Sequence, residues 1–172
     1  SVFQVAAHED TVPPPELYAA CGIARELLQG EHGVSRVIAR PFTGAPGAWT
    51  RTPGRKDFSL APPGVTLLEQ LQARHVPRVG VGKVDDLFSG RGITSIHTAT
   101  NGEAYRLIES ALATMHRGLL LANVIEFDQS WGHRNDVAGF HQGLEELDRE
   151  LPGMLSLMRE GDIVAFTADH GN

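Results

Sequence analysis

The stretch that decides the fold is LLLANVIEFDQSWGHRNDVAGF, residues 119–140. It opens with a mostly apolar run, residues 119–127, whose length and composition are typical of a buried strand. The run leads directly to Asp128, and His133 follows after a short loop that contains a glycine. From Val137 onward, apolar residues recur at spacings of three and four, which predicts an amphipathic helix. The pattern therefore predicts a strand that presents a carboxylate and an imidazole in the loop before a helix.

A second apolar run, residues 163–166, repeats this arrangement and is followed by Asp169 and His170. Two strands joined by a helix form a β-α-β unit, so we expect parallel strands and a right-handed crossover. Ligands of open parallel sheets bind beyond the carboxyl ends of the strands, which would bring both Asp–His pairs into one crevice. Such a mixed oxygen and nitrogen set suits Mn²⁺ or Zn²⁺. An aspartate after a strand is also often a helix cap, as we expect for Asp136, and the residues alone leave both interpretations open.

The rest of the chain predicts further alternation of strands and helices. Strands are expected at residues 2–6, 34–42 and 78–84, and helices at residues 16–28, 66–75 and 102–115. Pro41 is expected to stop the second strand, and Asn101 to cap the last of these helices. Residues 43–64 are rich in glycine and proline and are expected to form a long functional loop.

Composition narrows the class of protein. The 172 residues are 41% hydrophobic, which is enough for the core of one domain or of parts of two. The net charge of -6 argues against a nucleic-acid-binding surface, and no apolar run is long enough to span a membrane. The single cysteine, Cys21, excludes an internal disulfide and fits a reducing compartment. A cytoplasmic protein without nucleic-acid or membrane partners is therefore expected.

Several segments together resemble the phosphopentomutase family of the alkaline-phosphatase superfamily. They are RTPGRKDFSLAPPG, GVGKVDDLFSGRGIT, NVIEFDQSWGHRNDVAGFHQGLEELDRELPGM and TADHGN, in that order. The resemblance implies an α/β fold with a cap domain at residues 1–100 and a β-α-β piece of a parallel-sheet core at residues 101–172. It implies an isomerase that interconverts ribose or deoxyribose 1-phosphate and 5-phosphate. The reaction would use a phosphothreonine enzyme, a bisphosphate intermediate and two divalent ions, usually Mn²⁺.

The same resemblance assigns roles to particular residues. It implies two pairs of metal ligands, Asp128 with His133 and Asp169 with His170. It implies substrate contacts for Val2, Arg40 and Lys83. The family's nucleophilic threonine and its remaining ligands would lie outside these 172 residues, so the chain alone is expected to be inactive.

Other interpretations of the function of this chain remain open. The chain could be a non-catalytic substrate-binding module, or part of another metal-dependent phosphatase or mutase of the same superfamily, although the pentose-type segments favour the mutase. The stretch VGVGK suggests a phosphate-binding loop, but Pro77 and Val84 stand where that motif needs Gly and Ser or Thr. The basic residues between 51 and 56 are expected to be solvated, and His97 is expected to be structural.

Overall fold

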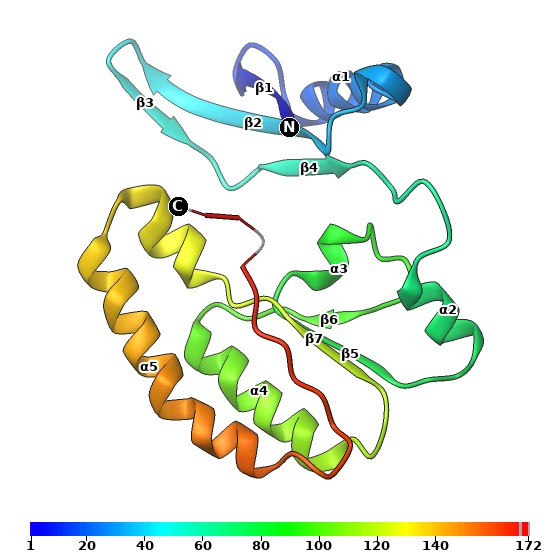
Figure 1. Ribbon diagram of the computed structural model, residues 1–172. Coiled ribbons are helices and arrows are strands. Elements are labelled where there is room, and N and C mark those ends of the chain that lie inside the picture. The colour runs from blue at the N-terminus through cyan, green and yellow to red at the C-terminus, as the bar shows by residue number, and fades with distance from the viewer. Residues whose placement is uncertain (169, 172) are drawn as a thin grey trace. The chain divides into compact units, whose positions relative to one another are not determined.

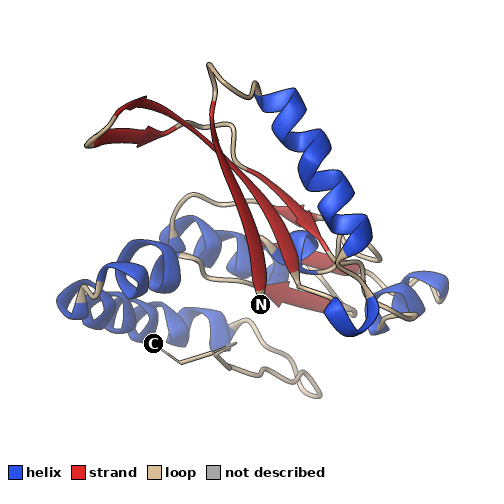
Figure 2. Cartoon of the chain, turned by 90° about the horizontal axis from the view of Figure 1, so that it is seen from above, coloured by secondary structure: helices blue, strands red, loops and turns tan. Residues whose placement is uncertain are grey.

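The computed structural model describes residues 1–168 and 170–171. The chain forms two compact units, Ser1–Pro63 and Gly64–Asn172, each of which is described by itself (Figures 1 and 2). The first unit contains β1 (Val2–His8), α1 (Pro14–Leu27), a 3-10 turn (Gly30–His32), β2 (Arg36–Ala45), β3 (Ala48–Arg51) and β4 (Lys56–Ser59). The second contains α2 (Leu67–Ala73), β5 (Arg78–Val81), α3 (Val84–Leu87), β6 (Ser95–Ile96), α4 (Asn101–Thr114), β7 (Leu119–Ala122), a π-helix (Phe127–Trp131), a 3-10 turn (Gly132–Arg134) and α5 (Val137–Ser156).

The first unit is a four-stranded sheet covered by one helix. β1 runs parallel to β2 along one edge, and β3 and β4 pair antiparallel with β2 along its other edge. Helix α1 buries Leu17 and Cys21 against Val37 and Ala39 of β2, and none of these four side chains is more than 1% exposed. Burial also raises the pKa of the Cys21 thiol. The expected strand at the start of the chain and the first helix are confirmed.

Pro41 does not stop β2, which corrects the expectation from the sequence. The carbonyl of Pro41 accepts a hydrogen bond from the Thr52 backbone at 3.2 Å. Because the N–H and carbonyl of one residue in a strand face the same side, the missing N–H of Pro41 also faces this edge. Residue 41 lies between the partners of β3, which start at Phe42, and those of β4, which end at Ala39. A residue without an N–H is tolerated where no neighbouring strand needs that donor.

Residues 43–64 are not one long loop, and this expectation was wrong. They contain most of a hairpin between β2 and β3, and then β4. The hairpin needs glycine at position 44, where φ is +110° and a Cβ would lie 2.3 Å from the carbonyl oxygen of Ala48. Trp49 packs edge-on against Phe42, with ring centroids 5.4 Å apart. The glycines therefore form tight turns between strands, and the aromatic pair fixes the hairpin.

The second unit is built on a three-stranded parallel sheet in the order β6-β5-β7. Its strands alternate with helices along the chain, so the α/β class with a parallel sheet is confirmed. Thr66 caps α2 through a reciprocal pair of hydrogen bonds with Glu69, as the capping-box pattern requires. The sheet joins strands from either side of residue 100, and the assignment of cap and core to residues 1–100 and 101–172 stays a prediction.

Three details of this unit differ from the sequence prediction. Thr100, not Asn101, is the N-cap of α4, because the Thr100 hydroxyl accepts the N–H of Glu103 while Asn101 lies inside the helix. β7 ends at Ala122, and the aromatic residues beyond it form a π-helix instead of extending the strand. Residues 163–166 form no strand among the described residues, because no neighbouring described strand pairs with their backbone. The β-α-β unit expected from residues 119–127 and 163–166 is therefore not formed.

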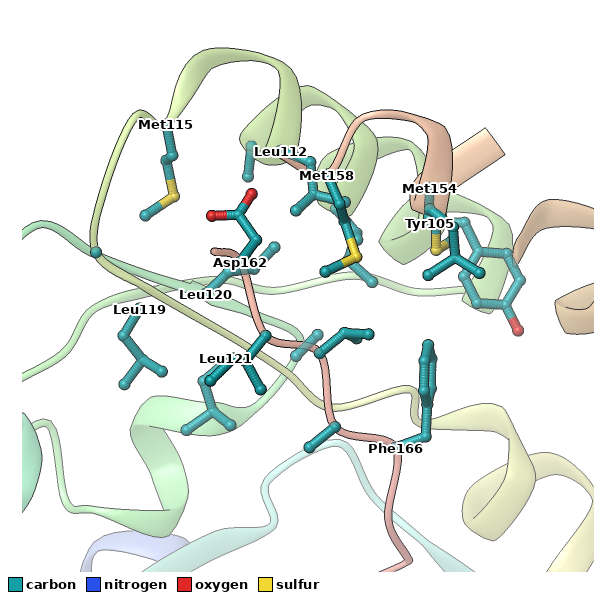
Figure 3. A pocket seen from close by; sticks show the side chains of 18 of the residues that line it. Tyr105, Leu112, Met115, Leu119, Leu120, Leu121, Met154, Met158, Asp162 and Phe166 are labelled. Atoms are coloured by element: carbon teal, nitrogen blue, oxygen red, sulfur yellow. The ribbon is translucent and has the colours of Figure 1, made fainter. Parts of the chain in front are cut away.

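Instead, residues 161–167 line an apolar cavity of about 530 Å³ beside α4, β7 and α5. Figure 3 shows three methionines and Phe166 around it, with Tyr105 at one side and leucines of β7 opposite. Within the described part of the chain, no helix is long and apolar enough to cross a membrane.

Candidate functional site

Asp128 lies in the π-helix Phe127–Trp131, which follows the carboxyl end of β7. Aromatic packing fixes this turn on α5: the Phe127 ring lies 5.3 Å from Trp131 and 5.1 Å from Phe140, measured between centroids. Two glycines of α5 make room for the indole, since a Cβ at Gly143 would lie 2.3 Å from it. The apolar side chains around Asp128 therefore determine where its carboxylate points.

Two imidazoles lie on either side of this carboxylate. His133 Nε2 is 3.4 Å from Asp128 Oδ2, and His170 Nε2 is 3.9 Å from Asp128 Oδ1. Of the other three predicted metal ligands, His133 and His170 therefore lie beside Asp128. The fourth, Asp169, lies outside the described residues. His133 is carried by the 3-10 turn after the π-helix, and Asn135 ends that turn in the left-handed conformation with φ of 52°.

The donor atoms fit a divalent cation. Asp128 Oδ1 is buried and accepts no hydrogen bond from the described residues, so this oxygen lacks the donor that a buried carboxylate normally has. Imidazole nitrogen and carboxylate oxygen together form the ligand type that binds Mn²⁺ or Zn²⁺ in proteins. The three side chains are also partly exposed, which leaves room for a substrate oxygen.

Lys83 follows the neighbouring strand, β5, at the same edge of the sheet. Gly82 adopts φ of +80°, and a Cβ there would lie 2.1 Å from the carbonyl oxygen of Asn123. The Asn123 N–H in turn donates to the carbonyl of Val81 at 2.9 Å. The segment that follows β5 and leads to Lys83 therefore contacts the segment that follows β7 and leads to Asp128, as expected where neighbouring parallel strands end.

Arg40 and Val2 belong to the first unit, on β2 and β1 respectively. The Arg40 guanidinium donates to Gln4 Oε1 on the neighbouring strand. Partial burial and the charges of Arg55 and Arg51 lower the pKa of Arg40. Sequence reasoning had treated these two arginines as solvated loop residues, and it missed that the β3 and β4 pairings bring them to Arg40.

This cluster of arginines carries one compensating carboxylate. Arg55 makes a bidentate hydrogen bond with Asp57, at 2.7 and 2.8 Å. Arg36 lies 3.5 Å from the same carboxylate. The positive charges exceed the negative ones, so an anion would be bound favourably here.

A further group of ionisable side chains lies after β5 and β6. His97 Nε2 is 2.8 Å from Asp85 Oδ1, and ligand atoms of Asp85, Asp86 and His97 all lie within 4.8 Å of one another. The contacts from His97 and Ser95 hold the pKa of Asp85 below its ordinary value, although partial burial alone would raise it. That His97 is structural stays a prediction, because this group could also hold a metal ion, and the sequence did not indicate the cluster.

Comparison with known proteins agrees with this chemistry. The model of the Metalloenzyme superfamily matches residues 17–172, and the chain belongs to that superfamily. More particularly, the chain is 50% identical to the phosphopentomutase of Dictyoglomus thermophilum and 54% identical to that of Anaeromyxobacter sp. (strain K), over 100% and 99% of its length. It spans 44% of the length of each of these relatives. The resemblance recognised in the sequence is confirmed.

Proposed function

We propose that this chain is part of a phosphopentomutase that interconverts the 1-phosphate and 5-phosphate of ribose or deoxyribose. The observation that carries the proposal is the meeting of Asp128, His133 and His170 at the carboxyl edge of a parallel sheet. The similarity to phosphopentomutases along the whole chain supports it. A cytoplasmic location belongs to the same proposal.

The proposed cofactors are two Mn²⁺ ions, for which this chain supplies Asp128, His133, Asp169 and His170 as ligands. When bound, such cations neutralise the negative charge on phosphoryl oxygens during transfer. The Asp128 carboxylate lies beside both imidazoles, and its buried oxygen would gain from a cation the partner that it lacks among the described residues. The phosphorylated threonine of the proposed mechanism is not one of the residues assigned here, so the isolated chain is expected to turn over no sugar phosphate.

The basic residues would hold the other phosphate of the sugar. Lys83 and Arg40 can each form charge-assisted hydrogen bonds with a phosphate oxygen, and Arg51 and Arg55 add positive charge beside Arg40. Holding the distal phosphate keeps a bisphosphate bound while it turns over, and this separates a mutase from a phosphatase. Val2 would contact the sugar from β1. The proposed substrate-binding cap comprises residues 1–100, and the proposed catalytic core comprises residues 101–172.

Two substitutions in the complete protein test the assignments. Asp128→Asn should lower Mn²⁺ affinity, measured by calorimetry on metal-free protein, and should abolish conversion of ribose 1-phosphate. Asp136→Asn is the matched control, because it removes a nearby charge while asparagine still caps α5. If Asp128→Asn binds Mn²⁺ as tightly as this control, the metal site is wrongly assigned.

Lys83→Ala should fail in a different way. It removes one charge-assisted contact, worth about 1.5–3 kcal/mol, which corresponds to roughly a 10- to 150-fold loss in kcat/KM. Mn²⁺ affinity should stay unchanged, and the ratio of phosphate release to isomerisation should rise. Release of phosphate without any isomerisation by the unsubstituted protein would favour the alternative of a phosphatase. No conversion of either kind would favour a non-catalytic binding module.

A further inference from the structure

A reciprocal pair of hydrogen bonds links the start of α4 to the segment that precedes Asp128. The backbone N–H of Asn101 donates to Glu126 Oε2 at 2.5 Å, and the backbone N–H of Glu126 donates to Asn101 Oδ1 at 3.0 Å. Asn101 is completely buried. The two residues are 25 positions apart, so this contact joins two separate elements of the second unit.

The linked segment has little other regular structure. Between the end of β7 and the helical turn that carries Asp128, residues 123–125 form neither strand nor helix. Other contacts also hold this segment: the Asn123 N–H donates to the carbonyl of Val81, the Ile125 carbonyl accepts the N–H of Gln129, and the Ile125 side chain is 8% exposed. Among the described residues, Glu126 is the last one before Asp128 whose backbone is hydrogen-bonded to another element.

The carboxylate of Glu126 also suits its place at the start of a helix. The first N–H groups of α4 have no partner inside the helix, and the helix dipole favours negative charge at that end. Thr100 satisfies the N–H of Glu103, and Glu126 satisfies that of Asn101. The start of α4 thus depends on a residue of the metal-binding segment as well as on its own cap.

Two buried polar groups lie beside this pair. The side-chain Nδ2 of Asn101 and the hydroxyl of Tyr105, one turn later, are both buried without a hydrogen-bond partner among the described residues. Leaving such groups unpaired costs free energy. An apolar residue in place of Asn101 would avoid part of this cost, but it would release the N–H of Glu126.

We propose that Asn101 is a positioning residue for the metal site: it holds the backbone at Glu126 and thereby sets the place of Asp128 between its two imidazoles. The inference rests on the proposed function, because it takes Asp128 as a metal ligand. Groups that orient a metal ligand typically contribute about 10- to 100-fold to metal affinity. Asn101 acts through Glu126 and does not itself contact the reacting groups.

The test measures the Mn²⁺ dissociation constant of metal-free complete protein, together with its urea unfolding midpoint. Asn101→Ala should weaken Mn²⁺ binding by about tenfold or more. Thr100→Ala is the matched control, because it removes a hydrogen bond at the same helix start without touching Glu126. Glu126→Gln keeps an acceptor for the Asn101 N–H and leaves the bond from the Glu126 N–H in place, so it should retain affinity. If Asn101→Ala does not fold, Asn101→Leu is closer in size to asparagine, removes the same acceptor for the Glu126 N–H and should give the same loss.

The outcomes separate the inference from the proposed function. A loss in Asn101→Ala or Asn101→Leu that exceeds that of Thr100→Ala by about tenfold, with affinity retained in Glu126→Gln, supports it. A smaller difference, or an equal loss in Glu126→Gln, overturns it, since the pair then serves only to stabilise the fold. If Asp128→Asn itself leaves Mn²⁺ affinity unchanged, the proposed metal site fails, and the role of Asn101 fails with it.

Discussion

Gly143 gives a sharp test of how α5 supports the metal-binding turn. It is buried in the helix, and a Cβ there would lie 2.3 Å from Trp131 Cζ3 and 3.2 Å from Phe127 Cε1. The indole cannot move aside easily, because its other edge lies over Gly139, where a Cβ would be 2.4 Å from Trp131 Cδ1. Gly143→Ala must therefore displace Trp131, and with it the turn that carries Asp128.

The expected magnitude follows from two opposing terms. Alanine in place of glycine stabilises a helix interior by about 1 kcal/mol. Overpacking a filled site costs about 1–3 kcal/mol, and the upper part of this range applies where an aromatic ring is confined on both sides. Gly143→Ala should therefore lower the free energy of unfolding by about 1–2 kcal/mol.

Gly153 in the same helix provides the matched control. A Cβ at position 153 meets only Glu109 Oε1, at 2.9 Å, and a flexible carboxylate can turn away. Gly153→Ala should therefore stabilise the protein by about 0.5–1 kcal/mol, the opposite sign to Gly143→Ala.

Urea unfolding followed by circular dichroism measures the difference between the two variants. The fluorescence of Trp131, read in a Trp49→Phe background, reports whether the indole has moved. If the Gly143→Ala protein is as stable as Gly153→Ala and its fluorescence is unchanged, then Gly139 and Gly143 are not needed to make room for Trp131.

Three further outcomes are expected from the structure. Thr66→Ala breaks the capping box with Glu69 and should lower the free energy of unfolding by about 1 kcal/mol in a urea titration. Burial, with a smaller effect of nearby glutamates, raises the pKa of Tyr105 to about 12. The folded state then holds this proton more tightly than the unfolded state, so stability should fall between about pH 10 and pH 12, and Tyr105→Phe should remove that fall in a pH series of melting temperatures. Partial burial alone would raise the pKa of Asp57, but the hydrogen bond and charge of Arg55 outweigh it and hold this pKa below its ordinary value. The stability that this carboxylate contributes should be present above about pH 4 and lost below it, and Asp57→Asn should melt with a weaker dependence on acid than the unsubstituted protein.

Local patterns in the sequence predicted most elements of the fold. The apolar residues of α1 and of α5 recur every three or four positions within each helix, so both helices could be predicted directly from the sequence. The expectations for Pro41 and for residues 43–64 were wrong because the structure of these residues depends on contacts with strands that are distant in sequence. Whether a proline stops a strand depends on which neighbour faces its missing N–H, and pairing of β2 with β3 and β4 decides that.

In the candidate site, too, contacts between residues close in sequence could be predicted, whereas contacts between distant residues could not. Asp128 and His133 are close in sequence, and the loop between them was enough to predict that they meet. The approach of Arg51 and Arg55 to Arg40 depends on strand register, and the contact between Asn101 and Glu126 spans separate elements. Neither arrangement leaves a short-range pattern that a single sequence could reveal.

The segment at residues 163–166 has a consequence for handling this protein. Its sequence, IVAF, combines β-branched and aromatic residues without charge or proline, and Ile163 is 94% exposed. Strands of this composition with free backbone groups readily pair with identical segments of other copies. Concentrated samples of the 172-residue chain should therefore form sheet-rich aggregates, and a lysine at position 163 should delay them by placing repelling charges in register.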